Sequence, residues 1–578
     1  MPSKIDIEFL RDQIIGNSYC FQTPFGKRLL TYADYTASGR SLKFIENYLI
    51  KIQAYYANTH TEDDASGRSM TRLLHLAEAS IKRNLNASEN CYLIPVGTGA
   101  TGAIGRLQQI LGVYIPPATR ARLTKIVETV RVTNPTSAEV LAELETEYRF
   151  NMPVVFIGPY EHHSNDISWR EGYAEVVEID LQADGQIDLQ DLETKLQSPQ
   201  YQNRMKIGSF SAASNVTGII SPVYEIARIL HRHDTLACFD FAASAPYVDI
   251  DMNRDEECYF DAVFISPHKF IGGPGSSGLL VVNKRVYNPD LSPTHPAGGT
   301  VRYVSAQGYD FHLDPEERER AGTPGILQVL KASLALEIKS EIGVDQIEAK
   351  EKLFTQQAVQ RLEKNPNIQI LGNPHAPERI GIFSIMIRHG EKYLHSRFAT
   401  SLLNDLFGIQ TRAGCVCAAP YGHRLLGISP EKSDQLRQVI SRGIECVKPG
   451  WLRFNFHFVF SQDDFEFICK AVEFVADFGY LFLPEYNLNF ASGGWLHNSI
   501  DKDDDYLNAE FGVSQALHEK LGDCFHENPL HRRQEYDHYF AVAKAQVKAL
   551  MSAPIPQYGK LNEPEAEALR WFEFVEGE

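Results

Sequence analysis

The sequence predicts an α/β fold in which helices flank a mainly parallel sheet, followed by a smaller α+β domain. Two observations support this. From residue 153, short apolar runs alternate with stretches of helical periodicity, which is typical of βαβ units. After about residue 330, predicted strands and helices mix without that alternation. Because 578 residues exceed what one hydrophobic core usually supports, we expect two or more domains.

The predicted strands of the larger domain are short, and most end at small or polar residues. They are Tyr92–Val96, Val154–Ile157, Glu175–Ile179, Lys206–Ser211, Leu236–Asp240, Ala262–Ser266 and Leu279–Val282. The last of these follows its predecessor so closely that we expect it to return as a hairpin at the sheet edge.

The periodicity divides the chain into four parts. They are an N-terminal segment packing with the small domain (1–45), a large domain (46–330), a small α+β domain (331–482) and a C-terminal extension without an assigned role (483–578). A helical insertion at 115–150 interrupts the large domain, and Thr136 with Glu139 predicts a capping box for its second helix. An acidic run at 501–505 lies in the extension.

Composition and charge exclude several classes of function. The net charge of −18 repels phosphate backbones, so we expect no nucleic-acid partner. No apolar run approaches the roughly 18 residues that span a bilayer, and we expect no membrane association. The charged N-terminal residues do not match a signal peptide, which favours the cytoplasm. There the 9 cysteines are expected to be free thiols.

The strongest motif is Ser266-Pro267-His268-Lys269, directly after a predicted strand. Ligands of α/β folds bind at the carboxyl ends of strands, although a single strand-end lysine is more often a solvated surface group. Asp240 ends the preceding predicted strand, and an acid there must find a partner or stay in water. A pyridinium nitrogen would be such a partner; an ordinary turn or N-cap role is the alternative.

Three further segments follow predicted strands. Gly97-Thr98-Gly99 opens a helix, where N–H groups favour a phosphate, but it lacks the ending of a P-loop. His162 in Glu161-His162-His163 could stack on an aromatic cofactor or move protons. No third ligand lies at a spacing suited to zinc, so we expect no metal site. Asn215 could bond a ring oxygen or simply form a turn.

The order of these motifs resembles the class V aminotransferase family of fold type I pyridoxal 5′-phosphate (PLP) enzymes. Within that family the sequence is most similar to cysteine desulfurases and selenocysteine lyases. The resemblance covers roughly Tyr32 to Phe460 and rests on the set formed by Glu-His-His, Ser-Asn-Val-x-Gly and Ser-x-His-Lys. It implies a PLP cofactor and an amino-acid substrate.

The resemblance also implies a role for each site residue. Lys269 would hold PLP as a Schiff base and move protons, Asp240 would pair with the pyridinium, His162 would stack on the ring, and Asn215 would hold the ring oxygen. Thr98, Gly99, Ser266 and His268 would bind the phosphate. Gly299-Thr300 resembles the segment that reaches the partner subunit's phosphate, which implies a homodimer. Arg453 would fork onto the substrate carboxylate.

The reaction depends on Cys417, which aligns with the nucleophile of the desulfurases five residues after Arg412. The Gly-Cys-x-Cys form of this segment also resembles molybdenum-cofactor sulfurases. A thiolate at Cys417 would take sulfur from cysteine, leaving alanine and a persulfide for a protein sulfur acceptor. The alternatives are a structural thiol in an aminotransferase, epimerase or C–S lyase, and a non-catalytic scaffold with the same fold.

Three residues depart from the desulfurase pattern. Ala243 stands where desulfurases have glutamine, Arg320 replaces an acid before Ala-Gly-Thr, and Gly99 makes the phosphate loop Gly-Thr-Gly-Ala rather than Gly-Thr-Thr. These departures affect the desulfurase prediction more than the PLP prediction. The extension is also too short to be the second domain of a full molybdenum-cofactor sulfurase.

Overall fold

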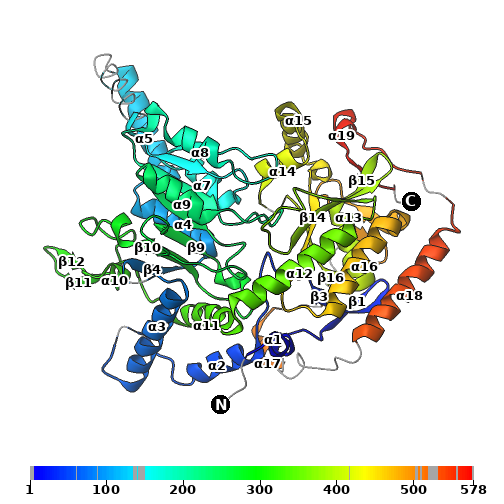
Figure 1. Ribbon diagram of the computed structural model, residues 1–578, viewed down its shortest axis with the longest axis horizontal. Coiled ribbons are helices and arrows are strands. Elements are labelled where there is room, and N and C mark those ends of the chain that lie inside the picture. Colours follow the sequence, from blue (N-terminus) through cyan, green and yellow to red (C-terminus); the bar gives the residue numbers. More distant parts are fainter. Residues whose placement is uncertain are drawn as a thin grey trace. The chain divides into compact units, whose positions relative to one another are not determined.

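The computed structural model (Figure 1) forms two compact units. Unit 1 comprises Met1–Lys43, Asn215–Gly218 and Asp345–Glu578, and unit 2 comprises Phe44–Ser214 and Ile219–Val344. The structure describes residues 5–575 except 60, 88, 134–139, 141–142, 144–146, 148–149, 416, 502–505, 508, 510, 519–531 and 555–556. The predicted capping box of Thr136 and Glu139, and residues 502–505 of the acidic run, lie outside the described residues.

Unit 2 is built on a seven-stranded sheet, which confirms the predicted fold class. Its order is β4 (Cys91–Val96), β10 (Gly278–Asn283), β9 (Ala262–Ile265), β8 (Thr235–Asp240), β7 (Lys206–Ser211), β5 (Val154–Ile157) and β6 (Glu175–Glu178). β10 pairs antiparallel with both neighbours, while β9, β8, β7, β5 and β6 run parallel.

The predicted edge position of Leu279–Val282 is wrong. The strand that contains it, β10, lies between β9 and β4, and the edges are β4 and β6. Its backbone passes close to the start of helix α4 (Gly99–Ile110), because a Cβ on Gly278 would lie 2.4 Å from the carbonyl oxygen of Gly99. Glycine at position 278 therefore permits the return strand to enter the sheet beside β4.

The core of unit 2 forms because α4 lays an apolar face on the sheet. Ile104 and Leu107 of α4 are buried with Phe264 of β9 and Leu280 of β10. On other parts of the unit, α3 (Ala65–Asn84) packs against α11 (Ile326–Ile342). Helix α5 (Pro117–Thr133) of the insertion has no buried residue of its own.

Unit 1 contains a six-stranded sheet that includes a strand from the C-terminal extension. The order is β17 (Arg412–Gly414), β18 (Trp451–Asn455), β14 (Ile382–His389), β15 (Lys392–Leu394) and β21 (Phe572–Glu573), with β13 (Ile368–Ile370) paired to β14. β21 runs parallel to β15, and Phe572 is fully buried. The extension therefore completes a sheet rather than standing apart from it.

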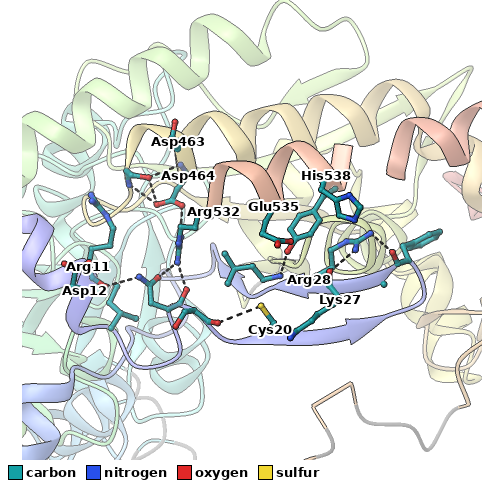
Figure 2. Close-up of a pocket in the computed structure, with 18 of the residues that line it drawn as sticks. Arg11, Asp12, Cys20, Lys27, Arg28, Asp463, Asp464, Arg532, Glu535 and His538 are labelled. Carbon is teal, nitrogen blue, oxygen red and sulfur yellow. Dashed lines mark hydrogen bonds and ion pairs between the residues drawn. The ribbon is translucent and has the colours of Figure 1, made fainter. Parts of the chain in front are cut away.

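A second element of the extension, α18 (Arg532–Leu550), packs on α16 (Gln462–Phe478). The Tyr536 ring stacks on Phe467 with centroids 3.6 Å apart, and its hydroxyl donates to Asp464 at 2.8 Å. Arg532 points to the same carboxylate, 2.8 Å away, as Figure 2 shows. Helix α18 also lines one side of a pocket of about 720 Å³ whose other walls include Arg11 and Lys27.

Replacing Tyr536 with alanine should destabilise unit 1 strongly. The change removes a buried aromatic ring and leaves a cavity, which costs about 3–5 kcal/mol. Urea unfolding followed by tryptophan fluorescence measures the loss. Arg533→Ala, on the exposed face of the same helix, is the matched control and should change stability by less than about 0.5 kcal/mol. Equal midpoints for the two variants would show that α18 contributes little to the fold.

Two kinds of feature, a membrane-spanning helix and a metal-binding group, are absent from the residues that the structure describes. Among them, no helix has the length and apolar character needed to cross a membrane. The described part of the chain also contains no group of three or more histidine, cysteine, aspartate or glutamate side chains arranged to hold a metal ion.

Candidate active site

Lys269 lies in a tight turn at the carboxyl end of β9. Ser266 precedes a short 3₁₀ helix, Pro267–Lys269, and the Lys269 N–H donates to the Ser266 carbonyl at 3.0 Å. The chain then folds back so closely that a Cβ on Gly273 would lie 1.8 Å from the Pro267 carbonyl oxygen. The glycines after Lys269 therefore permit a compact turn that fixes the lysine at the strand end.

Asp240 ends the neighbouring strand β8 and is buried. Among the described residues, its carboxylate accepts one hydrogen bond, from the Ala242 N–H at 2.8 Å. Burial raises the pKa of Asp240, while the Ala242 N–H and the positive charge of Lys269 oppose that increase. A buried carboxylate with so few donors favours a cationic or N–H partner.

The turn after β9 meets the N-terminus of α4. The Ser266 hydroxyl accepts a hydrogen bond from the Ala100 N–H at 2.9 Å. A Cβ on Gly99 would lie 2.7 Å from the Ser266 oxygen and 3.0 Å from the His268 ring, and Gly99 has a φ of +57°. Glycine at position 99, where the desulfurase pattern Gly-Thr-Thr has threonine, therefore avoids a steric clash with Ser266 and His268. Thr98 is the N-cap residue of α4, but its hydroxyl forms no capping hydrogen bond.

His162 follows β5 and caps a 3₁₀ helix, His163–Asn165. Its Nδ1 accepts a hydrogen bond from the Ser164 N–H at 3.2 Å, which places the proton of the neutral ring on Nε2. The Ser164 hydroxyl lies 2.7 Å from that of Thr101 on α4, so the histidine loop is tied to the same helix as the phosphate loop.

Glu161 is a site residue to which the sequence assigned no role. Its buried carboxylate accepts four hydrogen bonds, from the Gly158 N–H (3.1 Å), the Ser211 N–H (2.8 Å), the Ser211 hydroxyl (2.6 Å) and the Asn165 amide (2.6 Å). Burial raises its pKa to about 7 against the effect of these donors. Glu161 joins the end of β5 to the end of β7 and so orients the His162 loop.

Thr300 is fully buried within its own chain and follows Gly299, whose φ is +86°. Its hydroxyl donates to the Ala297 carbonyl at 2.7 Å. The predicted site residues divide between the two units. Unit 2 contains Thr98, Gly99, His162, Asp240, Ser266, His268, Lys269 and Thr300. Asn215, Cys417 and Arg453 lie in unit 1.

In unit 1, Arg453 on β18 is buried and donates to the Asn215 carbonyl at 3.3 Å. It also pairs with Asp34 at 2.8 Å. Cys417 is exposed, in the loop after β17, and its φ of +60° is a left-handed conformation that side chains other than glycine rarely adopt. Cys415 is partly buried, and its thiol donates to the Pro449 carbonyl at 2.8 Å.

Residues 144–465, more than half of the chain, match the family described as aminotransferase class-V, and the protein belongs to that family. A "Probable cysteine desulfurase" of Halalkalibacterium halodurans is 32% identical over 270 residues, which cover 46% of this chain and 62% of the relative. A "Cysteine desulfurase" of Haloferax volcanii is 28% identical over 273 residues, 46% of this chain and 60% of the relative. The matches therefore span less than two thirds of these relatives.

Solved structures support the fold. The apo cysteine desulfurase of Thermococcus onnurineus NA1 matches with a TM-score of 0.61 at 20% identity, over 82% of this chain and all of that one. The cysteine desulfurase CsdA of Escherichia coli matches with a TM-score of 0.56 at 20% identity, over 76% and 93% of the two chains. At this identity the likeness establishes a shared fold and leaves the reaction to the site.

Proposed function

We propose that the protein is a PLP-dependent enzyme of the cysteine desulfurase type, which transfers sulfur from L-cysteine to Cys417 and releases alanine. The observation that carries the proposal is the exposed Cys417 held in a left-handed backbone conformation. Such strain costs on the order of 1 kcal/mol or more and is typical of functional sites. Membership of the class V aminotransferase family and similarity to proteins named as cysteine desulfurases support the same chemistry.

The residues of unit 2 fit PLP. The buried Asp240 carboxylate suits a pyridinium N–H, and the N-terminus of α4, with Thr98, Ser266 and His268, suits a phosphate. Lys269 would hold the aldehyde carbon, and His162 would cover the ring. When bound, PLP supplies an electron sink for negative charge that develops on the substrate.

The chain's own residues then account for the sulfur transfer. The Cys417 thiolate attacks the substrate sulfur, so that an S–S bond forms while the substrate's Cβ–S bond breaks. The electron pair stays with the substrate carbon, which takes up a proton and becomes the methyl group of alanine. Lys269 and the Nε2–H of His162 are the proton donors on the protein. The sulfur remains on Cys417 as a persulfide. Because Cys417 is exposed, this sulfur can be passed to an acceptor protein.

We further propose that a second copy of the chain is the partner. The β11–β12 hairpin (Val301–Val304 and Tyr309–Phe311), which follows Gly299-Thr300, exposes three large side chains. Tyr303, Val304 and Tyr309 are each 60–63% exposed. Apolar groups gathered in this way favour a protein interface.

The proposal is tested by incubating the purified protein with L-cysteine and a thiol reductant. Equal amounts of alanine and sulfide are expected. Pyruvate and ammonia together with sulfide would instead identify a C–S lyase. A keto acid that forms in the presence of an amino-group acceptor would identify an aminotransferase. Formation of D-cysteine would identify an epimerase. Absence of both product and visible absorption would favour the scaffold. A panel of other amino acids then defines the substrate.

Asp240→Ala should reduce turnover by about 10²–10³-fold, because the charge that keeps the ring nitrogen protonated is lost. The phosphate contacts do not involve Asp240, so part of the PLP should remain bound. Steady-state rates and the bound PLP per chain measure the two effects. Glu256→Ala, an exposed acid of the same unit, is the control. Unchanged turnover in Asp240→Ala would mean that another acid faces the ring.

A further inference from the structure

Helix α5 carries an apolar stripe that remains largely exposed. Leu123, Ile126, Val127 and Val130 recur at the spacing that places side chains on one face of a helix. Leu123 is 53% exposed and Ile126 is 59% exposed, and no residue of α5, all of which the structure describes, is buried. Figure 1 shows α5 extending away from the sheet of unit 2. Because a helix gains most of its stability by packing such a stripe against another element, the exposed part of this one favours a partner.

The second half of the insertion presents a row of exposed residues as well. Val140, Glu143, Glu147 and Phe150 are all helical and all exposed. Their spacing is that of a heptad repeat, which aligns them along one side of a helix. From Val140 to Phe150 the row is about 15 Å long, since a helix rises about 1.5 Å per residue. An apolar group therefore stands at each end of the row, with two carboxylates between them.

The two halves of the insertion carry opposite charges. Helix α5 contains four basic residues and one acidic residue. Its Arg122 and Lys125 are exposed, and each directly precedes one of the exposed apolar residues. Among the described residues, neither of these cations forms an ion pair with Glu143 or Glu147, and the Glu147 carboxylate accepts only a long hydrogen bond from the Asn151 amide at 3.5 Å. Two cations and two carboxylates are thus exposed on the same insertion without neutralising each other.

These charges indicate which kind of partner fits. A wholly acidic surface would attract the cations of α5 and repel Glu143 and Glu147, and a wholly basic surface would do the reverse. A surface that carries both signs beside exposed apolar groups suits both halves, and the insertion of a second copy is such a surface. Pairing about a two-fold axis brings each half against the opposite half of the other copy. Cations then meet carboxylates, and the apolar residues of α5 meet those of the second half.

We propose that a second copy of the chain binds the insertion surface, formed by the exposed side of α5 and the row from Val140 to Phe150, with the cations of α5 in each copy facing the carboxylates of the other. This surface is separate from the β11–β12 hairpin, since Figure 1 shows the two elements projecting from different places on unit 2. Helix α5 also precedes the residues that match the family, 144–465. The pairing depends on neither PLP nor the reaction, and it joins dimers made through β11–β12 into larger assemblies.

Light scattering after size-exclusion chromatography of the purified protein measures the number of chains per particle. Arg122→Glu combined with Lys125→Glu places carboxylates against carboxylates across the interface. Glu143→Lys combined with Glu147→Lys places cations against cations. Because like charges at an interface repel, each double variant should have half the mass of the wild-type particle or less.

An equimolar mixture of the two double variants gives the sharper test. Every reversed half then meets a half of opposite charge in the other variant, so the wild-type mass should return. All four residues are exposed and outside the active site, so the circular dichroism spectrum and turnover of each variant should match those of the wild type. The control combines Arg228→Glu and Arg232→Glu on the exposed side of α9 (Val223–Arg232), which makes the same change in charge and should keep the wild-type mass.

Leu123→Ser combined with Ile126→Ser leaves the charges unchanged and should also halve the mass, because the apolar contact is lost. This variant decides the question if a charge-reversed variant fails to fold. A mass equal to that of the wild type in both charge-reversed variants would overturn the proposal and leave the insertion surface to a different protein. A mixture that stays at the mass of its separate components would overturn it as well.

Discussion

Lys269→Ala is expected to abolish both the yellow colour of the purified protein and its turnover. No other side chain lies in the turn after β9 with an amino group to hold the cofactor covalently. The same group is assigned the proton transfers, whose loss alone costs about 10²–10⁴-fold in rate. Absorption spectra and alanine release measure the two effects, and some PLP should remain bound without a covalent link.

Borohydride reduction followed by peptide mapping gives the sharper reading of this result. The reduced adduct should lie on Lys269 in the wild type and be missing from the variant. Lys284→Ala, which removes an exposed lysine after β10, is the control and should keep colour, adduct and rate. An adduct found on any other lysine of the wild-type protein would refute the assignment of the cofactor site.

Cys417→Ser is expected to stop alanine and sulfide formation from L-cysteine while the visible band stays intact. A serine hydroxyl is about the same size as the thiol but is a far weaker nucleophile at neutral pH, and it cannot carry the sulfur away. The cofactor residues of unit 2 are unchanged by the substitution, so PLP content should equal that of the wild type. Product analysis and the bound PLP per chain measure the two parts of the prediction.

Cys415→Ser is the matched control for this prediction. The Cys415 thiol is partly buried, burial raises its pKa, and it is engaged by the Pro449 carbonyl, so it is a poor nucleophile. Its loss should leave most of the activity. Full turnover of Cys417→Ser with some amino acid would move the protein to the aminotransferase, epimerase or lyase class and leave Cys417 a structural thiol.

The sequence could predict the parts of the site that follow local strand ends. Asp240 and the Ser266–Lys269 turn both lie where a short apolar run stops, and both positions agree with β8 and β9. The position of β10 could not be predicted in this way. Local periodicity shows that a strand exists, but its neighbours depend on pairing with β4, which is far away in sequence.

Asp34 shows the same limit for the site itself. The two arginines that pair with Asp34, Arg412 and Arg453, are 378 and 419 residues away along the chain. The short loop that contains Asp34 gives no indication of them. Glu161 was visible only as the first letter of a histidine motif, because two of its four donors come from Ser211, which is 50 residues away on β7. Charge networks that join distant segments are settled by tertiary packing rather than by any local pattern.

The extension was left without a role because its pattern is weak. Apart from the 19-residue helix α18, its described elements are short: β19 (Tyr486–Leu488), β20 (Trp495–His497), α17 (Val513–His518), α19 (Pro564–Leu569) and the two-residue strand β21. A strand of two residues is too short for alternation to be recognised. Only pairing with β15 identifies it as part of a sheet.

The division of the chain has a consequence for the order of folding during synthesis. Unit 2 is nearly continuous from Phe44 to Val344, so its strands can pair as soon as they emerge from the ribosome. Unit 1 begins earlier, with Met1–Lys43, yet its β3 (Thr31–Tyr32) pairs with β16 (Ile409–Gln410). At roughly 5–20 residues per second, that first segment waits some tens of seconds for its partner. The time for which this strand remains unpaired, rather than the stability of the folded protein, then sets its risk of misassembly.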